Sequence, residues 1–329
     1  MVGFIFVVIF LFYSTNSAEI KPKLIIDHDG GADDAMAIFM ALLYEKHFDG
    51  PEIIALTTAH GNVDEDQVFK NTQRILTIAE RRDIPIYRGS SKSLITTYPP
   101  GDYFGSDGLG DNITEYEPIA AQREHAVPTL IELSKKYEGE LIILTLGALT
   151  NIALAVRLDS SFVSRLSQLY VAAGHIYSEE YNMLEFNALM DIEAYQAVVG
   201  DGPADKITTI PSSQIRTYHN ISKEWRKDIL GGIDTDIVRA LNIFERKSFN
   251  ATDNWCHLDP SAMAVVLKSS IVEETRYSKN SIILCGDQRG INTNNFTTSS
   301  DANVRVIYKV RVEPYKQLLY EIFSAQLQN

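Results

Sequence analysis

Short apolar runs alternate with amphipathic segments from residue 23 to residue 210, and this alternation restricts the possible folds more than any other feature of the sequence. Runs such as KLIID (23–27) and ELIILTLG (140–147) are apolar almost throughout, as in strands that are buried on both faces. The segments between the runs, such as 34–48, carry apolar residues at helical spacing. The alternation predicts an α/β fold with a doubly wound, mostly parallel sheet flanked by helices.

The carboxyl-terminal part of the chain continues this pattern less regularly. Two strands and a closing helix are expected there, in SIILCG (281–286), NVRVIYKVRV (303–312) and YKQLLYEIFSAQL (315–327). Region 89–120 is rich in Gly, Pro, Ser and Asp, and it reads as a long loop of the kind that often carries binding residues. No long linker, low-complexity tract or repeat divides the chain, so we expect one domain over residues 19–329.

The first 18 residues read as a secretory signal peptide. An apolar run from Val2 to Tyr13 is followed by small polar residues up to Ala18, where cleavage is expected. The run is shorter than the roughly 20 apolar residues of a membrane helix, and an uncleaved anchor is the alternative. Residues 1–18 are therefore assigned to a signal peptide, and the mature protein is expected to be secreted, with no membrane partner after cleavage.

Two further features fit an exported protein. Four N-x-S/T sequons, the acceptor pattern for N-glycosylation, begin at Asn112, Asn220, Asn250 and Asn295. The chain has two cysteines, Cys256 and Cys285, which an oxidising compartment allows to pair; whether they do is left open. The formal net charge of −13 argues against nucleic acid as a partner, because nucleic-acid binders usually carry a basic surface.

Four aspartates fall within eight residues of DHDGGADDAMAI (27–38), directly after the first apolar run. The cluster lies where a strand ends and a helix begins, which is the edge at which open α/β sheets bind ligands. The helix dipole favours carboxylates in the first helical turn, and Gly30 and Gly31 allow the chain to turn sharply. Four carboxylates around one tight turn suit a hard cation such as Ca²⁺ or Mg²⁺. A helix cap with a solvated acidic rim is the simpler alternative.

Six motifs, in order along the chain, resemble those of the inosine–uridine-preferring nucleoside hydrolases. DHDGGADDA resembles the amino-terminal D-x-D-x-G-x-D-D-A signature of that family. The other five are TTAHGNV (57–63), DGLGD (107–111), LGALTNIALA (146–155), EFNALMDIEA (185–194) and LDPSAMAV (258–265). Any one match could arise by chance, but the ordered series covers most of residues 24–270.

The resemblance implies a single domain that binds Ca²⁺ and hydrolyses ribonucleosides to free base and ribose, with a homo-oligomer as the family's usual state. Asp29 would be the general base and also a metal ligand. Asp34, Asp259 and the backbone carbonyl of Leu146 would complete the protein ligands of the metal. The substrate would be held by Asp33, Asn62, Asn182, Glu185, Phe186 and Asn187.

These residue types suit the reaction. Ca²⁺ takes several oxygen ligands, so it can hold sugar hydroxyls and polarise a water molecule, and a neighbouring carboxylate can accept the proton of that water. Cleavage of a glycosidic bond builds positive charge on the sugar, which nearby carboxylates stabilise. A helix start is the alternative explanation of Glu185 and Asn187, because the helical pattern DIEAYQAVV (191–199) follows them.

The sequence departs from the family pattern around the leaving base. Phe104 stands where a His-Gly pattern is often found, and Leu258 stands where the family often has His. His257, one position away, is expected to be a packed or surface residue and not an acid. The candidates for aromatic stacking on the base are Phe104, Tyr181, Phe186 and Trp255, with core packing as the alternative for each.

Two other functions compete with nucleoside hydrolysis. A haloacid-dehalogenase-like phosphatase has a D-x-D-G-T motif that begins like DHDG, with Asp27 as nucleophile and Asp29 as acid; Gly31, however, occupies the usual Thr position. A secreted protein that binds nucleosides or Ca²⁺ without turnover is the alternative of a different class.

Overall fold

The computed structural model describes residues 21–112, 116–255 and 257–328. The predicted signal peptide (1–18) lies outside the described residues, and so does Cys256, on which any pairing with Cys285 depends. Within the described part of the chain, no helix is both long and apolar enough to cross a membrane.

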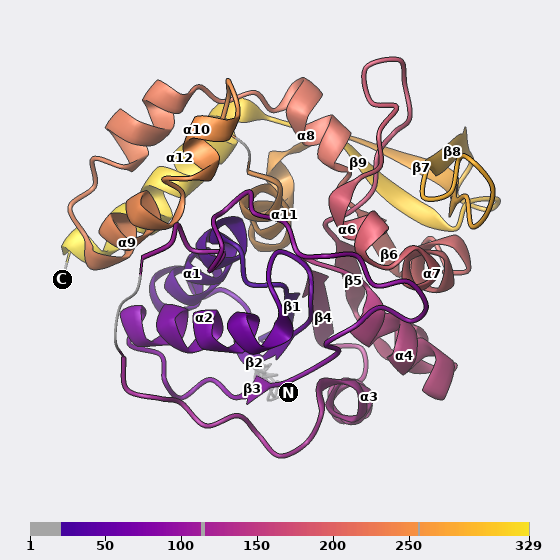
Figure 1. The fold of residues 1–329 in the computed structure, drawn as a ribbon, viewed down its shortest axis with the longest axis horizontal. Helices are drawn as coiled ribbons and strands as arrows, with labels where there is room; N and C mark the ends of the chain where they lie inside the picture. The colour runs from indigo at the N-terminus through magenta and orange to yellow at the C-terminus, as the bar shows by residue number, and fades with distance from the viewer. Residues whose placement is uncertain (1–20, 113–115, 256, 329) are drawn as a thin grey trace, which may run out of the picture.

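Nine strands in the described residues form one sheet in the order β3-β2-β1-β4-β5-β6-β9-β7-β8 (Figure 1). The strands are β1 (Lys23–His28), β2 (Glu52–Thr58), β3 (Ile86–Tyr87), β4 (Leu141–Thr145), β5 (Gln168–Val171), β6 (Ile207–Thr209), β7 (Val272–Ile282), β8 (Asn292–Thr297) and β9 (Val304–Val310). All neighbouring pairs from β3 to β9 are parallel, and β7 is antiparallel to both β8 and β9. The predicted mostly parallel sheet is confirmed.

Helices flank this sheet. The α-helices are α1 (Ala32–Phe48), α2 (Glu65–Ile78), α3 (Ala126–Lys136), α4 (Thr150–Leu158), α5 (Phe162–Arg165), α6 (Phe186–Met190), α7 (Ile192–Tyr195), α8 (Ser212–Tyr218), α9 (Asp236–Phe244), α10 (Ser248–Ala251), α11 (Leu258–Leu267) and α12 (Val312–Ser324). Two π-helical turns, η1 (Gln196–Gly200) and η2 (Trp225–Leu230), and two 3₁₀ turns, η3 (Ser269–Ile271) and η4 (Ala325–Gln328), complete the helical residues.

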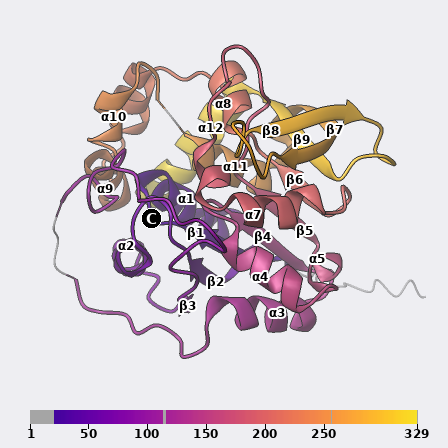
Figure 2. The same ribbon diagram turned by 45° about the vertical axis from the view of Figure 1, so that its right-hand side comes forward.

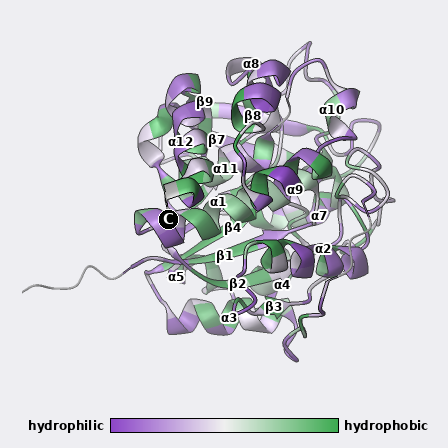
Figure 3. Ribbon diagram, turned by 90° about the vertical axis from the view of Figure 1, so that its left-hand side faces the viewer, coloured by the Kyte–Doolittle hydropathy of each residue, from purple (hydrophilic) through white to green (hydrophobic). Residues whose placement is uncertain are grey.

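Each face of the sheet packs on its own apolar core. Leu24 and Ile26 of β1 belong to the core formed with α1, α9, α11 and α12, whereas Ile25 belongs to the core formed with α3, α4 and α7. This alternation is the two-residue period of an extended strand, with apolar side chains on both faces. Figure 2 shows α3 and α4 on the opposite side of the molecule from α9 and α10, and Figure 3 shows the hydrophobic colour along β1 and α1.

The carboxyl-terminal strands differ from the expectation. The expected strand at 281–286 is wrong apart from its first two residues, because β7 runs from Val272 to Ile282 and is followed by a hairpin to β8. Both strands alternate buried or partly buried with exposed residues at the sheet edge. Polar segments such as NTNNFT (292–297) can therefore be strands although they contain no apolar run. The strand at β9 and the closing helix α12 are confirmed.

A buried ion pair joins η2 to the end of α9. The side chains of Arg226 and Glu245 are 2% and 6% exposed, and Nε of Arg226 donates to Oε2 of Glu245 at 2.7 Å. The other oxygen of Glu245 accepts a hydrogen bond of 2.7 Å from the indole nitrogen of Trp255. The pair therefore fixes an aromatic side chain as well as two helical segments.

We expect Arg226→Met to lower the free energy of unfolding by about 3–5 kcal/mol, because it leaves the Glu245 carboxylate buried without its cation. The matched double variant, Arg226→Met with Glu245→Gln, removes the charge and keeps an acceptor for Trp255, so it should recover most of the loss. Guanidinium denaturation of the three proteins measures both effects. A double variant as unstable as the single one would contradict the expectation.

Candidate active site

The candidate site lies where the strand order reverses. The chain runs outward from β1 through β2 to β3 on one side, and β4 lies on the other side of β1. The carboxyl ends of β1 and β4 are joined there, since the Leu146 backbone N–H donates to the Asp27 carbonyl at 2.8 Å. Ligands of doubly wound sheets bind in the crevice outside such a switch point. This topology places the aspartate cluster beside Leu146, as the sequence motifs required.

A tight turn carries the chain from β1 into α1. Gly30 has φ of +78°, a left-handed conformation that side chains rarely adopt. The Asp34 carboxylate then reaches back over the helix start and accepts backbone hydrogen bonds from Gly31 at 2.7 Å and from Asp29 at 3.2 Å. Gly31 is the N-cap residue of α1, and Asp29 lies in the turn before it. The turn thus fixes Asp34 through the backbone of the residues that precede it.

Asp29 is fully buried between the segments that follow β2 and β4. Its carboxylate accepts hydrogen bonds from the backbone N–H of Asn62 at 3.0 Å and from the Asn62 side chain at 2.6 Å. Glycines lie against it on two sides: a Cβ atom would come within 1.9 Å of Asp29 Oδ2 at Gly61 and within 2.8 Å of its side chain at Gly147. Both glycines follow strands, β2 and β4, so the sheet itself leaves room for this carboxylate.

Three carboxylates form a possible metal centre. Oxygen atoms of Asp33, Asp34 and Asp259 all lie within 4.8 Å of one another. Asp33 had been expected to bind ribose, so the mutually close set contains Asp33 where the resemblance assigned Asp29. Asp259 lies at the start of α11, more than two hundred positions after Asp34 in the sequence, and the fold places it beside the first turn of α1. Asp34 and Asp259 are buried and Asp33 is partly exposed, and such a set of oxygen donors fits the preference of Ca²⁺.

The pKa values of the four aspartates show that burying these carboxylates close together costs free energy. Burial raises the pKa of Asp29 to about 6 and that of Asp33 to about 7, with the charge of Asp29 adding to the effect on Asp33. Burial, together with the neighbouring aspartates, raises the pKa values of Asp34 and Asp259 well above their usual range. A cation among these groups would offset both the burial and the mutual repulsion. The residues present therefore fit the implied metal.

Asp27 belongs to a separate, closed environment. Its carboxylate accepts hydrogen bonds from the Thr57 hydroxyl and from the Asn151 amide, the latter at 2.8 Å. Burial raises its pKa to about 7. Asp27 and Asp29 are both 0% exposed, and neither lines the cavity beside the cluster. They differ in their partners: Asp29 is hydrogen-bonded to Asn62, which lines the cavity, whereas Thr57 and Asn151, the partners of Asp27, do not. Asp27 is thus separated from the cavity by its own contacts, which does not favour a phosphatase with Asp27 as nucleophile.

A cavity of about 800 Å³ opens above the carboxylates. Its floor includes Asp33, Asn62, Leu146 and Asp259. The expected aromatic candidates all reach this cavity, namely Phe104, Tyr181, Phe186 and Trp255. Its walls thus combine polar groups near the metal centre with rings farther along, as in many small-molecule sites.

Glu185 and Asn187 line the cavity while holding the backbone in place. Glu185 caps α6: its carboxylate accepts backbone hydrogen bonds from Asn187 at 3.2 Å, from Ala188 at 2.9 Å and from Gly174 at 2.8 Å. The Asn187 amide donates to the carbonyl of Leu146 at 2.8 Å. The helix start that competed with substrate binding is therefore present, and the same two side chains also face the cavity.

Asn182 is the one predicted substrate residue that the structure does not bring to the site. It is exposed in the loop before α6, and its neighbour Tyr181 lines the cavity in its place. The assignment of Asn182 to substrate binding stays a prediction from the resemblance, and the cavity lining does not include it.

One residue of the cavity, His219, was not predicted from the sequence. It follows α8 and lines the cavity together with His257. His257 was expected to pack or lie at the surface, and it is packed, being 2% exposed. Burial lowers the pKa of His219 to about 2 and that of His257 to about 4, so both rings are neutral at physiological pH. No family motif includes His219, and only the path of the chain after α8 brings it here.

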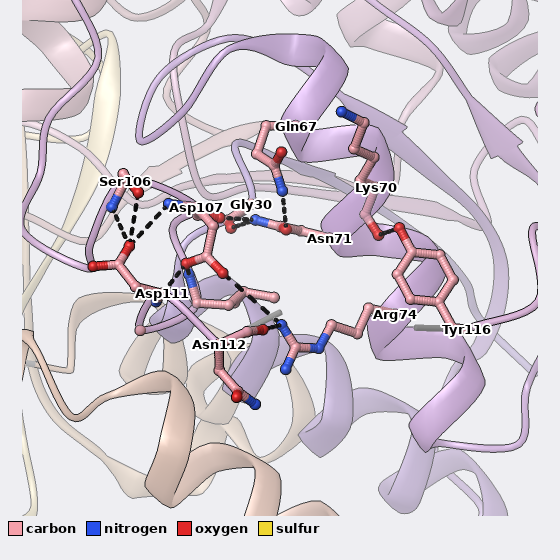
Figure 4. A network of polar contacts seen from close by, with 12 residues as sticks. Gly30, Gln67, Lys70, Asn71, Arg74, Ser106, Asp107, Asp111, Asn112 and Tyr116 are labelled. Atoms are coloured by element: carbon pink, nitrogen blue, oxygen red, sulfur yellow. Dashed lines mark hydrogen bonds and ion pairs between the residues drawn. The ribbon is translucent and has the colours of Figure 1, made fainter. Parts of the chain in front are cut away.

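The long loop 89–112 is tied to the aspartate turn by a polar network (Figure 4). The side-chain amide of Asn71, on α2, donates both to the Gly30 carbonyl at 2.8 Å and to the Asp107 carbonyl at 2.7 Å. Within the loop, the Asp107 carboxylate accepts backbone hydrogen bonds from Leu109 at 2.8 Å and from Asp111 at 2.7 Å. The DGLGD motif is therefore connected through Asn71 to the turn that carries the aspartates, and it stabilises the position of that turn.

Comparison with known proteins shows the family of this chain. The model of the family described as inosine-uridine preferring nucleoside hydrolase matches residues 24–317. Uridine nucleosidase 1 of Arabidopsis thaliana is 39% identical over 160 residues, which are 47% of this chain and 46% of that protein. The inosine-uridine preferring nucleoside hydrolase of Leishmania major is 32% identical over 187 residues, 54% of this chain and 57% of that protein. The alignments thus span about half the length of these relatives.

A solved structure resembles the whole fold. A plant nucleoside hydrolase superimposes with a TM-score of 0.82 and 26% sequence identity, covering 92% of this chain and 99% of that one. The likeness thus covers nearly the whole chain.

We expect the calcium-free protein to become less stable as pH rises from about 4 to about 7. The folded state holds protons on Asp27, Asp29 and Asp33 with pKa values of about 7, 6 and 7, whereas the unfolded chain releases them near the ordinary value of 3.8. The stability gained from these protons is complete below the unfolded value and is lost as pH passes the folded values.

Added Ca²⁺ should have the opposite dependence, because the metal binds carboxylates without protons. The rise in Tm caused by Ca²⁺ should therefore be larger at about pH 8 than at about pH 5. Thermal unfolding with Ca²⁺ and with chelator, at both pH values, measures the difference. An equal Ca²⁺ effect at the two pH values would contradict the assignment of these carboxylates to a metal centre.

Proposed function

Since the chain belongs to the inosine–uridine-preferring nucleoside hydrolase family, we propose that it hydrolyses the N-glycosidic bond of ribonucleosides to free base and ribose. The observation that carries this proposal is the convergence of Asp33, Asp34 and Asp259 with Asp29 at the carboxyl edge of the sheet, below a cavity of about 800 Å³. A cavity of this size accommodates a molecule as small as a nucleoside.

We propose Ca²⁺ as the cofactor. Asp29, Asp34 and Asp259 would hold it through their carboxylates, and Leu146 through its backbone carbonyl. When bound, the ion would supply positive charge that lowers the pKa of a water molecule and orients sugar hydroxyls. The raised pKa values of Asp29, Asp34 and Asp259 support this proposal, because they show that added positive charge would be favoured beside these carboxylates.

Asp29 is the proposed general base. Two hydrogen bonds from Asn62 fix its carboxylate, and its pKa of about 6 lies near neutrality. A base works best when its pKa is close to the working pH. Asp29 can therefore be ionised at neutral pH and still accept the proton of an attacking water.

The sugar would be held by the polar floor of the cavity. Asp33, Asn62, Glu185 and Asn187 all line it, and each presents oxygen or amide groups. Glu185 accepts three backbone N–H groups, which fix the position of a carboxylate that can stabilise positive charge on the ribose ring. Phe186 adds an aromatic face at the same helix start.

A binding protein without turnover is the remaining alternative, because the chain lacks the family's usual His before Asp259. Release of reducing sugar from inosine separates the two functions, since a binding protein would retain the nucleoside intact. A homo-oligomer stays a prediction from the family, and so does the choice between purine and pyrimidine nucleosides.

We also propose that the protein is secreted, with residues 1–18 removed. The apolar leader and the sequons support this proposal, because Asn220, Asn250 and Asn295 are exposed and so accessible to glycosylation.

We expect Asp29→Asn to reduce kcat on inosine by about 10²–10⁴-fold, the usual value of general-base catalysis. Asn62, Asp33 and Glu185 remain to hold the sugar, so nucleoside affinity should change much less. Steady-state release of ribose and direct binding of inosine by calorimetry measure the two effects.

Asp27→Asn is the matched control for this variant. It changes a carboxylate two positions away whose partners, Thr57 and Asn151, do not line the cavity, so the folded protein should keep most of its turnover. Near-normal turnover of Asp29→Asn, combined with an inactive Asp27→Asn, would refute the assignment of the base.

We expect protein recovered from the medium of the producing cell to begin after Ala18 and to carry glycans on at least one of Asn220, Asn250 and Asn295. Intact-mass and peptide mass spectrometry before and after enzymatic deglycosylation measure both features. Protein found only in the cytosol with residues 1–18 intact would contradict secretion.

A further inference from the structure

One N-glycosylation sequon opens onto the proposed active site. Asn220, the first residue of the sequon N-I-S (220–222), lines the cavity of about 800 Å³ and is exposed to solvent. The structure describes all four sequon asparagines, and the other three, Asn112, Asn250 and Asn295, are not part of the cavity lining. A glycan on Asn220 would therefore begin at the cavity itself.

The exposure of the lining residues shows that Asn220 lies at the mouth of the cavity. Glu185, Asn187 and His219 are buried members of the lining, so they belong to its interior. The exposed members mark the mouth, and they are Glu180, Arg216, Thr217, Asn220, Asp253 and Asn254. Between His219 and Asn220 the chain therefore passes from the wall of the cavity to its rim.

The backbone on both sides of Asn220 is held in place. On one side, the His219 N–H donates to the Ile215 carbonyl at 2.9 Å, at the end of α8. On the other side, Ile221 is buried, and its carbonyl accepts a hydrogen bond of 3.2 Å from the Trp255 backbone N–H. Trp255 also lines the cavity, so the first sugar would be attached at a fixed position beside this wall.

Attachment of the glycan uses a lipid-linked oligosaccharide pyrophosphate of the secretory compartment as donor. The amide nitrogen Nδ2 of Asn220 forms a bond with C1 of the first sugar, and the bond between that carbon and the pyrophosphate breaks. The lipid pyrophosphate leaves with the electron pair, and the amide gives up one proton. The product is a bulky, hydrated group. Segment 219–222 contains no helix or strand, so the group projects from an exposed loop.

We propose that an N-glycan on Asn220 stands over the mouth of the cavity and restricts the site to free nucleosides. This inference rests on the proposed hydrolysis of nucleosides and on the proposed secretion. A substrate must pass the mouth to reach the floor, which includes Asp33, Asn62 and Asp259. A flexible chain of sugars leaves paths for a molecule as small as inosine. A nucleoside joined to a large group, however, must displace the glycan while its ribose occupies the floor.

The test compares inosine with a derivative that carries a neutral polyethylene glycol chain on its 5′-oxygen and keeps both ring hydroxyls free. Ser222→Ala removes the sequon but leaves Asn220 in the lining, and Ser222 itself does not line the cavity. In protein secreted by a eukaryotic cell, this variant should raise kcat/KM for the derivative by about tenfold, within the range of association rates among variants of one site, and change kcat/KM for inosine by about threefold or less. Because both values come from one preparation, their ratio does not depend on the folded fraction.

Ser222→Thr is the matched control, because Thr preserves both the sequon and a hydroxyl like the one that accepts the Trp225 backbone N–H at 3.2 Å. It should leave the ratio of the two kcat/KM values unchanged. Asn250→Gln and Asn295→Gln remove sequons that lie outside the cavity lining, so they should also leave the ratio unchanged. Enzymatic removal of the glycans from the unmodified protein should reproduce the effect of Ser222→Ala.

Peptide mass spectrometry of the secreted protein shows whether Asn220 carries a glycan. An unoccupied Asn220 would overturn the inference. So would an equal ratio with and without the glycan, including the case in which both forms exclude the large derivative. Failure of the glycosylated and the deglycosylated protein to hydrolyse inosine would instead refute the proposed function, and protein found only in the cytosol would refute the proposed secretion.

Discussion

The repulsion among buried carboxylates is the constraint on which the rest of this structure depends. Asp29, Asp33, Asp34 and Asp259 are gathered at one end of the sheet, and their raised pKa values record the free energy of burying them together. The fold offsets part of this cost with the amino terminus of α1, whose N–H groups meet the Asp34 carboxylate. The repulsion that is not offset would be reduced by a bound cation. Stability of the fold and binding of a metal are therefore expected to be linked.

The sheet topology makes this gathering possible. The carboxyl ends of β1, β2 and β4 meet at the switch point, so the segments that follow them come together there. Gly61 and Gly147 leave space on both sides of Asp29, and Asn62 supplies its hydrogen bonds. Asn71 then ties the turn to the DGLGD loop from outside. A site of this precision needs support from several elements, since a carboxylate held by one loop could move away from its neighbours.

Much of this could be predicted from the sequence, because the parallel core and the aspartate turn are local patterns. Apolar runs reveal strands buried on both faces, and the DHDGGADDA segment concentrates its chemistry in consecutive residues. The β7–β8 hairpin was missed for a physical reason: edge strands with one exposed face carry polar residues and show no apolar run. Asn182 lies in an exposed loop outside the cavity lining, and the position of such a loop is set by tertiary packing that a local motif does not encode.

The wall of the cavity could not be predicted because it is assembled only by tertiary packing. His219, Trp255 and His257 come from the region between β6 and β7, whereas the floor comes mainly from the ends of β1, β2 and β4 and from the start of α11. The two parts meet at α11, which begins directly after His257 of the wall and carries Asp259 of the floor. A chain built in this way can change the residues of the wall while the carboxylates of the floor remain as they are.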